Sequence, residues 1–135
     1  MRVVIDTNIL VSFAIRPSPN FEKFFDHLAA HGISLVSEDA IAELLDVLSR
    51  DKFRKYIPFE QCLDYVEWYA GVSEQVAITE LIVARDYPKD DKFLSVAFSG
   101  KADCNVAGDR HLLDMRRFRE IPLYRPAEFI SRFIR

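Results

Sequence analysis

The sequence predicts an α/β fold, namely a three-layer α/β/α sandwich with a mostly parallel sheet of four to five strands. Short β-branched or apolar runs alternate with longer segments of helical periodicity along the chain. Hydrophobic residues make up 50% of the 135 residues, enough to bury one core. No linker, repeat or low-complexity stretch divides the chain, so residues 1–135 are expected to form a single domain.

The first part of the chain predicts a strand, a helix and a second strand. Residues 3–5 (VVI) are typical of a buried strand that ends at Asp6. After a loop marked by prolines, Asn20 can cap a helix with apolar residues at i, i+3, i+4 and i+7. Gly32 ends that helix, and residues 33–36 (ISLV) form the next strand.

A second amphipathic helix follows. Ser37 can cap it, and its apolar stripe recurs at helical spacing from Ile41 to Leu48. Glu43 falls beside this stripe on a helical wheel, so its side chain can face a cleft at the sheet edge. The remaining expected elements are a short helix at 51–57, a helix at 59–70, a strand at 76–78, a helix from Asp90 or Asp91, a strand at 104–107, a short helix at 110–117, a strand at 121–124 and a helix from Pro126.

Four acids occupy positions that a parallel sheet brings together. Asp6 and Asp109 each follow a strand, and Asp91 stands at the start of a helix. These positions, together with Glu43, share the carboxyl edge of the sheet, where ligands bind in such folds. Clustered carboxylates stay ionised only if cations neutralise them, and oxygen-only ligands select Mg²⁺ or Mn²⁺. Such ions activate water and stabilise charge on a phosphodiester, which indicates phosphoryl chemistry.

Each acid also has a simpler explanation. Aspartate is common after strands and at helix starts, because its side chain caps free backbone N–H groups. From spacing alone, therefore, the four positions do not distinguish a metal site from a set of caps.

Charge is unevenly distributed. The net charge of −3 argues mildly against a nucleic-acid partner, since phosphate binding favours a basic surface. Two basic groups modify this: Lys52, Arg54 and Lys55 in one, and Arg116, Arg117, Arg119, Arg125, Arg132 and Arg135 in the other. They are either a nucleic-acid surface or solvated helix faces.

The chain has the marks of a cytoplasmic protein. Its apolar runs are far shorter than a membrane span, and it begins without the apolar stretch of a signal peptide. Cys62 and Cys104 have no metal-binding spacing and are expected to be reduced thiols, with a disulfide between them as the alternative.

Several motifs, in order, resemble those of the PIN-domain family. The resemblance covers essentially the whole chain. The matching runs are VIDTNIL (residues 4–10), AEL (42–44), PKDDKFL (88–94), VAGDRHLL (106–113) and AEFI (127–130). The chain looks most similar to a bacterial or archaeal branch of toxins from toxin–antitoxin pairs, relatives of the VapC-type ribonucleases.

The resemblance implies a function and assigns roles to residues. It implies an endoribonuclease that cleaves single-stranded RNA by metal-activated water, without a covalent intermediate and with an antitoxin protein as its regulatory partner. The catalytic and metal-binding residues would be Asp6, Glu43, Asp91 and Asp109, with Thr7 and Asn8 in support through hydrogen bonds to Asp6 or to the metal's water. The family spacing favours Asp91 over Asp90, because Asp91 precedes Asp109 by 18 residues.

One position departs from the family pattern. Ala107 stands where the family usually has Thr or Ser, which removes one hydroxyl near the metal or substrate. The alternative function is therefore a weak or inactive PIN domain that binds RNA or protein. An aspartate-nucleophile phosphatase is disfavoured because position 8 is Asn, and a receiver domain because Asp6 has no acidic neighbour.

Other residues have competing interpretations. His27 and His31 are four residues apart on one helix and could share a metal, although His31 more simply complements the helix C-terminus. His111 could contact substrate or lie on a surface helix. Tyr65, Trp68 and Tyr69 supply either core packing or the interface of a homodimer.

Overall fold

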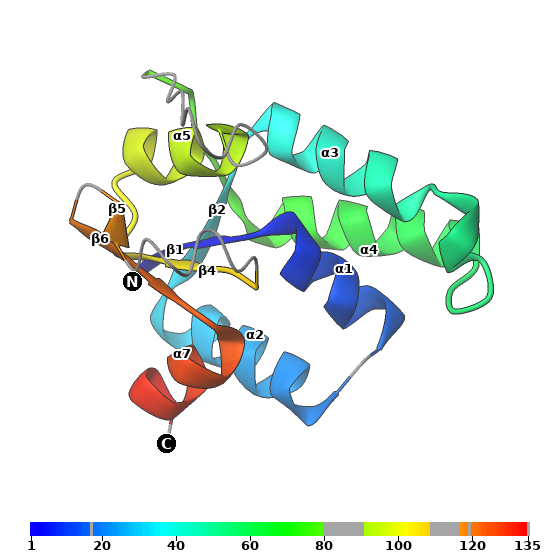
Figure 1. Ribbon diagram of the computed structural model, residues 1–135, viewed down its shortest axis with the longest axis horizontal. Helices are drawn as coiled ribbons and strands as arrows, with labels where there is room; N and C mark the ends of the chain where they lie inside the picture. Colours follow the sequence, from blue (N-terminus) through cyan, green and yellow to red (C-terminus); the bar gives the residue numbers. More distant parts are fainter. Residues whose placement is uncertain (17, 80–90, 109–116, 119, 135) are drawn as a thin grey trace.

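The computed structural model describes residues 1–16, 18–79, 91–108, 117–118 and 120–134. Strands and helices alternate along the chain as the sequence predicts (Figure 1). The elements are β1 (Arg2–Ile5), α1 (Thr7–Ile15), α2 (Pro19–His31), β2 (Ile33–Val36), α3 (Glu38–Leu48), a 3-10 helix η1 (Asp51–Phe53), α4 (Phe59–Val72), β3 (Glu74–Gln75), α5 (Asp91–Ser99), β4 (Cys104–Val106), β5 (Arg117–Phe118), β6 (Ile121–Tyr124) and α7 (Pro126–Phe133).

The strands form one mostly parallel sheet. Their order is β3-β2-β1-β4-β6-β5, and neighbours from β3 to β6 are parallel, while β5 pairs antiparallel with β6. The short strand β1 lies at the centre, flanked by β2 and β4. The prediction of a mostly parallel α/β sheet is therefore confirmed, with an antiparallel edge strand in addition.

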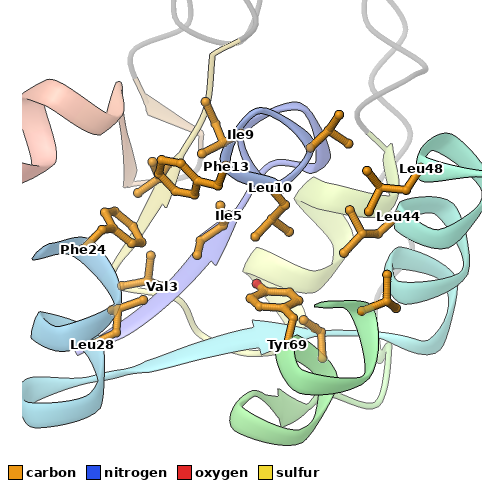
Figure 2. Close-up of a cluster of buried hydrophobic side chains, with 14 of the residues drawn as sticks. Val3, Ile5, Ile9, Leu10, Phe13, Phe24, Leu28, Leu44, Leu48 and Tyr69 are labelled. Atoms are coloured by element: carbon orange, nitrogen blue, oxygen red, sulfur yellow. The ribbon is translucent and has the colours of Figure 1, made fainter. Parts of the chain in front are cut away.

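Helices cover both faces of this sheet, as the alternation of side chains along β1 requires. Val3 and Ile5 point into a core shared with α1, α2, α4 and α7, and Phe24 and Tyr69 lie in the same core (Figure 2). Phe24, Tyr69 and Phe129 are almost fully buried there. Val4 and Leu35 point to the other face and pack against α5. Helix α3 packs on α1 and α4 and contributes Leu44 and Leu48 to the first core. The result is the three-layer arrangement.

Some local expectations were wrong. Residues 7–15 form a helix that the periodicity did not indicate, because this segment is apolar on most of its sides and four of its residues are buried. Helix α2 begins at Pro19 after the N-cap residue Ser18, not after Asn20, since proline suits the first helical position. Strand β3 is Glu74–Gln75, earlier than the expected 76–78, although the Val76 amide still donates to Val36 O at 2.8 Å.

The structure can also be compared with the expectations for the helix at 110–117, for the two cysteines and for membrane spans. Of the predicted helix at 110–117, residues 110–116 lie outside the described part, and Arg117 belongs to strand β5. Both cysteines are buried and free, and burial raises the pKa of the Cys104 thiol to about 12. Among the described residues, no helix is long and apolar enough to cross a membrane.

Candidate functional site

The carboxyl ends of the central strands meet at one edge of the sheet. Ile5, Val106 and Tyr124 stand in register across β1, β4 and β6. The strand order reverses between β1 and β4, with β2 and β3 on one side and β6 on the other. Ligands in open parallel sheets bind at such a reversal point, beyond the carboxyl ends of the strands. The site predicted around Asp6 falls at this position.

Asp6 links the end of β1 to the start of α1. Its amide donates to Val106 O at 2.8 Å, and its carbonyl accepts from the amides of Ile9 and Leu10 at 3.1 and 3.2 Å. The backbone is thus held by both β4 and α1. The side chain makes no capping hydrogen bond to the helix, and Asp6 is only 7% exposed. The Asp6 side chain is thus enclosed at the carboxyl edge of the sheet rather than projecting into solvent.

Glu43 approaches the same edge from α3. Ser37 caps this helix, as predicted, by accepting a hydrogen bond from the Ala40 amide at 3.1 Å. Helices α1 and α3 pack together, and the Thr7 hydroxyl donates to Glu43 Oε2 across 3.3 Å. This hydrogen bond connects Thr7 and Glu43, which are 36 positions apart in the sequence, at the residue that follows Asp6.

A small cavity borders this contact. Its volume is about 20 Å³, room for one water molecule. Thr7 and Glu43 are among its lining residues, and the rest of the lining is largely apolar, including Leu10, Leu44 and Phe93. Among the lining residues of this cavity, Thr7 is the polar side chain that contacts Glu43, and most of the others are apolar.

The other two predicted acids are only partly placed. Asp91 is the first residue of α5, which packs on β1, β2 and α3, but its side chain lies outside the described residues. Asp109, Asp90 and His111 lie outside them as well. The last described residue before Asp109 is Gly108, and a Cβ built there would come within 2.9 Å of Ile9 Cδ1, so the chain leaving β4 passes against α1.

The described side chains fit a hard divalent cation in their chemistry. Asp6 and Glu43 offer carboxylate oxygens, and Thr7 and the exposed Asn8 offer neutral oxygens. No histidine or cysteine is among these candidate donors, which suits Mg²⁺ or Mn²⁺ better than Zn²⁺. Within the described ranges, no group of three or more metal-ligating side chains comes together, and two of the four predicted acids fall outside that search.

Two buried residues, one in β4 and one directly after it, have features that the sequence did not reveal. Asn105 is 0% exposed, and both atoms of its amide lack a hydrogen-bond partner among the described residues. Ala107 is also fully buried and belongs to the apolar cluster against α5. The apolar run around Asn105 had indicated only a strand, so nothing in the sequence distinguished its amide.

The competing interpretations of the histidines and aromatic residues can also be compared with the structure. His27 and His31 have ring centroids 5.1 Å apart, and burial is the main factor that lowers the pKa of His27. Tyr69 is buried, and its hydroxyl is hydrogen-bonded to that of Ser34. Trp68, in contrast, is 40% exposed. The aromatic residues of α4 thus divide between core and surface.

Comparison with known families and sequences gives two matches. A family model described as PIN domain matches residues 2–111. An uncharacterized protein of Methanocaldococcus jannaschii is 31% identical over 119 residues, which cover 86% of this chain and 76% of that protein.

Solved structures with a similar fold include two VapBC structures. A chain of VapBC2 from Rickettsia felis, solved bound to a DNA fragment from the promoter, matches with a TM-score of 0.66 and 18% identity over 93% of this chain and 98% of that one. A chain of VapBC-1 from nontypeable Haemophilus influenzae matches with a TM-score of 0.64 and 16% identity, over 94% of this chain and 99% of that one. The PIN domain endonuclease Utp24 matches with a TM-score of 0.55 and 22% identity, over 90% of this chain and 82% of that one.

Proposed function

Because this chain belongs to the PIN-domain family, we propose that it is a metal-dependent endoribonuclease that cleaves single-stranded RNA and acts as the toxin of a toxin–antitoxin pair. The observation that carries the proposal is the hydrogen bond from Thr7, the residue after Asp6, to Glu43, at the edge where strand order reverses. Their oxygen-only chemistry suits Mg²⁺ or Mn²⁺, and family resemblance adds Asp91 and Asp109 to the set.

Under this proposal, each residue of the site has a role in cation binding or positioning. Asp6, Glu43, Asp91 and Asp109 would hold the cation, which when bound supplies the charge that activates water and stabilises the scissile phosphate. Thr7 orients Glu43 through its hydroxyl, and Asn8 extends from the first turn of α1 toward solvent. Backbone hydrogen bonds to β4 and α1 fix the point of the chain from which the Asp6 carboxylate projects. A metal-binding group held in this way needs less reorganisation during the reaction.

Single-turnover cleavage of a labelled single-stranded RNA tests this proposal. Cleavage is expected with Mn²⁺ or Mg²⁺ and not with EDTA. Asp6→Asn and Glu43→Gln should each lower the rate by at least about a hundredfold, the scale of losing one strong electrostatic contact to the transition state. Glu38→Gln is the matched control on α3, where it removes an exposed carboxylate. RNA bound but never cleaved by the unaltered protein would favour the alternative function, a binding module.

The proposed regulatory partner is an antitoxin protein, in keeping with the fold shared with the two VapBC structures. A small neighbouring gene encoding a DNA-binding motif would be its source. Co-expression of the two genes should relieve any growth arrest and yield a complex that purifies together. Growth arrest that the neighbouring gene does not relieve would contradict this part of the proposal.

A homodimer in the cytoplasm is the proposed state of the protein. Along α4, four apolar side chains are between 40% and 49% exposed. At about 100° per residue they fall on two opposite sides of the helix, with Phe59 and Leu63 on one side and Trp68 and Val72 on the other. The patch formed by Trp68 and Val72 is the one proposed to pack against a second copy. The two buried, free cysteines agree with a reducing compartment. Sedimentation at micromolar concentration should give a dimer, and Trp68→Glu should give a monomer that still cleaves RNA.

A further inference from the structure

An aromatic ring and a cation lie together at the carboxyl end of β6. The guanidinium carbon of Arg132, on α7, lies 5.5 Å from the centre of the Tyr124 ring and 6.0 Å from that of Phe133. The two rings meet edge to face with centroids 5.8 Å apart. A guanidinium within about 6 Å of a ring centre is attracted to its face, so these three side chains hold one another in place.

Arg132 forms no ion pair with any carboxylate of the described residues. Arg132 is exposed, and among the described residues no carboxylate lies within salt-bridge distance of it; the ion pairs there are Arg2–Glu74 and Arg50–Asp46. Glu128 stands one turn earlier on α7, but its carboxylate accepts a hydrogen bond from the Arg125 amide at 3.3 Å. An exposed arginine stacked on a ring is well suited to bind phosphate, because its guanidinium donors still face solvent.

These side chains border an open pocket. It has a volume of about 520 Å³, and its lining residues are Tyr124, Ala127, Glu128, Ser131 and Arg132. That volume is within the range of about 300–1,000 Å³ that small-molecule sites occupy. The lining combines one phenol ring, a serine hydroxyl, a carboxylate and a guanidinium. The ring can stack on a base, the serine and arginine can donate to a base or a phosphate, and the carboxylate can accept from a base.

The pocket lies on the same edge of the sheet as Asp6. Tyr124 is in register with Val106, which is in register with Ile5, the residue before Asp6. The Ala107 amide also donates to Tyr124 O at 2.9 Å, which holds the ends of β4 and β6 together. Two strand spacings separate Tyr124 from Ile5, a distance of about 10 Å. In an extended RNA strand, the nucleotide next to the scissile phosphate can therefore reach from the Asp6 edge to Tyr124.

We propose that this pocket is a nucleotide subsite of the nuclease, in which the Tyr124 ring stacks on a base of single-stranded RNA and Arg132 binds a phosphate next to the scissile one. The inference rests on the proposed function, since it places RNA at the edge marked by Asp6. Stacking on aromatic rings and contact of arginine with phosphate are the general means by which proteins bind single strands. Both residues are therefore positioning residues for the substrate.

Fluorescence anisotropy of a labelled single-stranded RNA, measured in EDTA with all variants built on Asp6→Asn, tests the subsite without cleavage. Tyr124→Ala and Arg132→Ala should each raise Kd at least about fivefold, whereas Tyr124→Phe should change it less than about twofold. Arg132→Ala should also reduce the slope of log K against log salt by about 0.7, the loss of one phosphate contact. Arg50→Ala, which removes an exposed arginine after α3, should leave Kd within about twofold.

Melting temperatures separate a local effect from unfolding, and exposed Arg132 remains decisive if Tyr124→Ala is unstable. Unchanged binding by both alanine variants, or an equal loss in Arg50→Ala, would overturn the subsite. RNA binding that depends on Tyr124 and Arg132 in a protein that never cleaves would leave the subsite standing and reject the nuclease function. If the protein cleaves RNA but neither Tyr124→Ala nor Arg132→Ala changes its binding, the nuclease function stands and the subsite is rejected. A parent protein that neither binds nor cleaves RNA rejects both.

Discussion

The hydroxyl of Thr7 donates a hydrogen bond to Glu43 across 3.3 Å, and this contact joins the first residue of α1 to the middle of α3. Thr7→Val keeps the shape of the side chain and removes the donor, while Thr7→Ser keeps the donor. A hydrogen bond to a charged group contributes about 1.5–3 kcal/mol, and this one is long, so Thr7→Val should slow cleavage by roughly tenfold. Single-turnover rates check this. Equal rates for the two variants would remove Thr7 from the mechanism.

Divalent cations should stabilise the folded protein. Mg²⁺ or Mn²⁺ at 100 times its Kd would contribute about 2.7 kcal/mol through preferential binding to the folded state. Asp6→Asn should abolish most of the resulting rise in melting temperature, and Asp26→Asn, which changes an exposed aspartate of α2, should leave it intact. A protein whose melting temperature ignores both ions at millimolar concentration would count heavily against the metal site.

Asp90 and Asp91 should differ in function despite being neighbours. Helix α5 begins at Asp91, and successive helical residues point about 100° apart, so both cannot aim at one metal. Asp91→Asn should lower cleavage at least about a hundredfold, while stability without metal holds or rises because like-charge repulsion is relieved. Asp90→Asn preserves a good capping residue and should change little. The opposite result would move the catalytic assignment by one residue.

Tyr69 should make stability depend on alkaline pH. Burial raises the pKa of its phenol to about 12, above the ordinary value of about 10. The folded state therefore favours the neutral phenol, and this stabilisation is complete below about pH 10 and lost as the pH rises toward 12. Tyr69→Phe should cost about 1 kcal/mol at pH 7, through the lost bond to Ser34, and progressively less above pH 10. Urea denaturation at pH 7, 9 and 11 measures the difference, and a constant difference would contradict the prediction.

Asn105 should be a destabilising residue of the core. Its buried amide has no hydrogen-bond partner among the described residues, and leaving such a group unsatisfied costs about 1–3 kcal/mol. Asn105→Leu keeps the branched shape of the side chain but enlarges it, so it should raise the free energy of unfolding by up to that amount. Asn105→Val serves as the smaller companion in case leucine overpacks the site. A loss of stability in both variants would mean that the Asn105 amide is satisfied by hydrogen bonds beyond the described residues, and would contradict the prediction.

Local sequence determined the elements with a clear period or cap. The strands at 2–5, 33–36 and 121–124 and the helices begun by Ser37 and Pro126 follow from short apolar runs, side-chain capping and proline at the first helical turn. Once the sheet is parallel, the position of Asp6 at its carboxyl edge follows as well. These features depend on residues near one another in the chain, so they can be read without the fold.

Contacts between distant segments decided the rest. Helix α1 is apolar on most sides because it is enclosed by the sheet and neighbouring helices, so its sequence carries no amphipathic period. Strand β3 lies at Glu74–Gln75 because pairing with Leu35 and Val36 sets its register, not the apolar residues after it. The contact between Thr7 and Glu43, the stacking of Arg132 on Tyr124 and the exposure of Trp68 beside buried Tyr69 likewise arise only when helices pack on the sheet, since free energy of packing depends on three-dimensional neighbours.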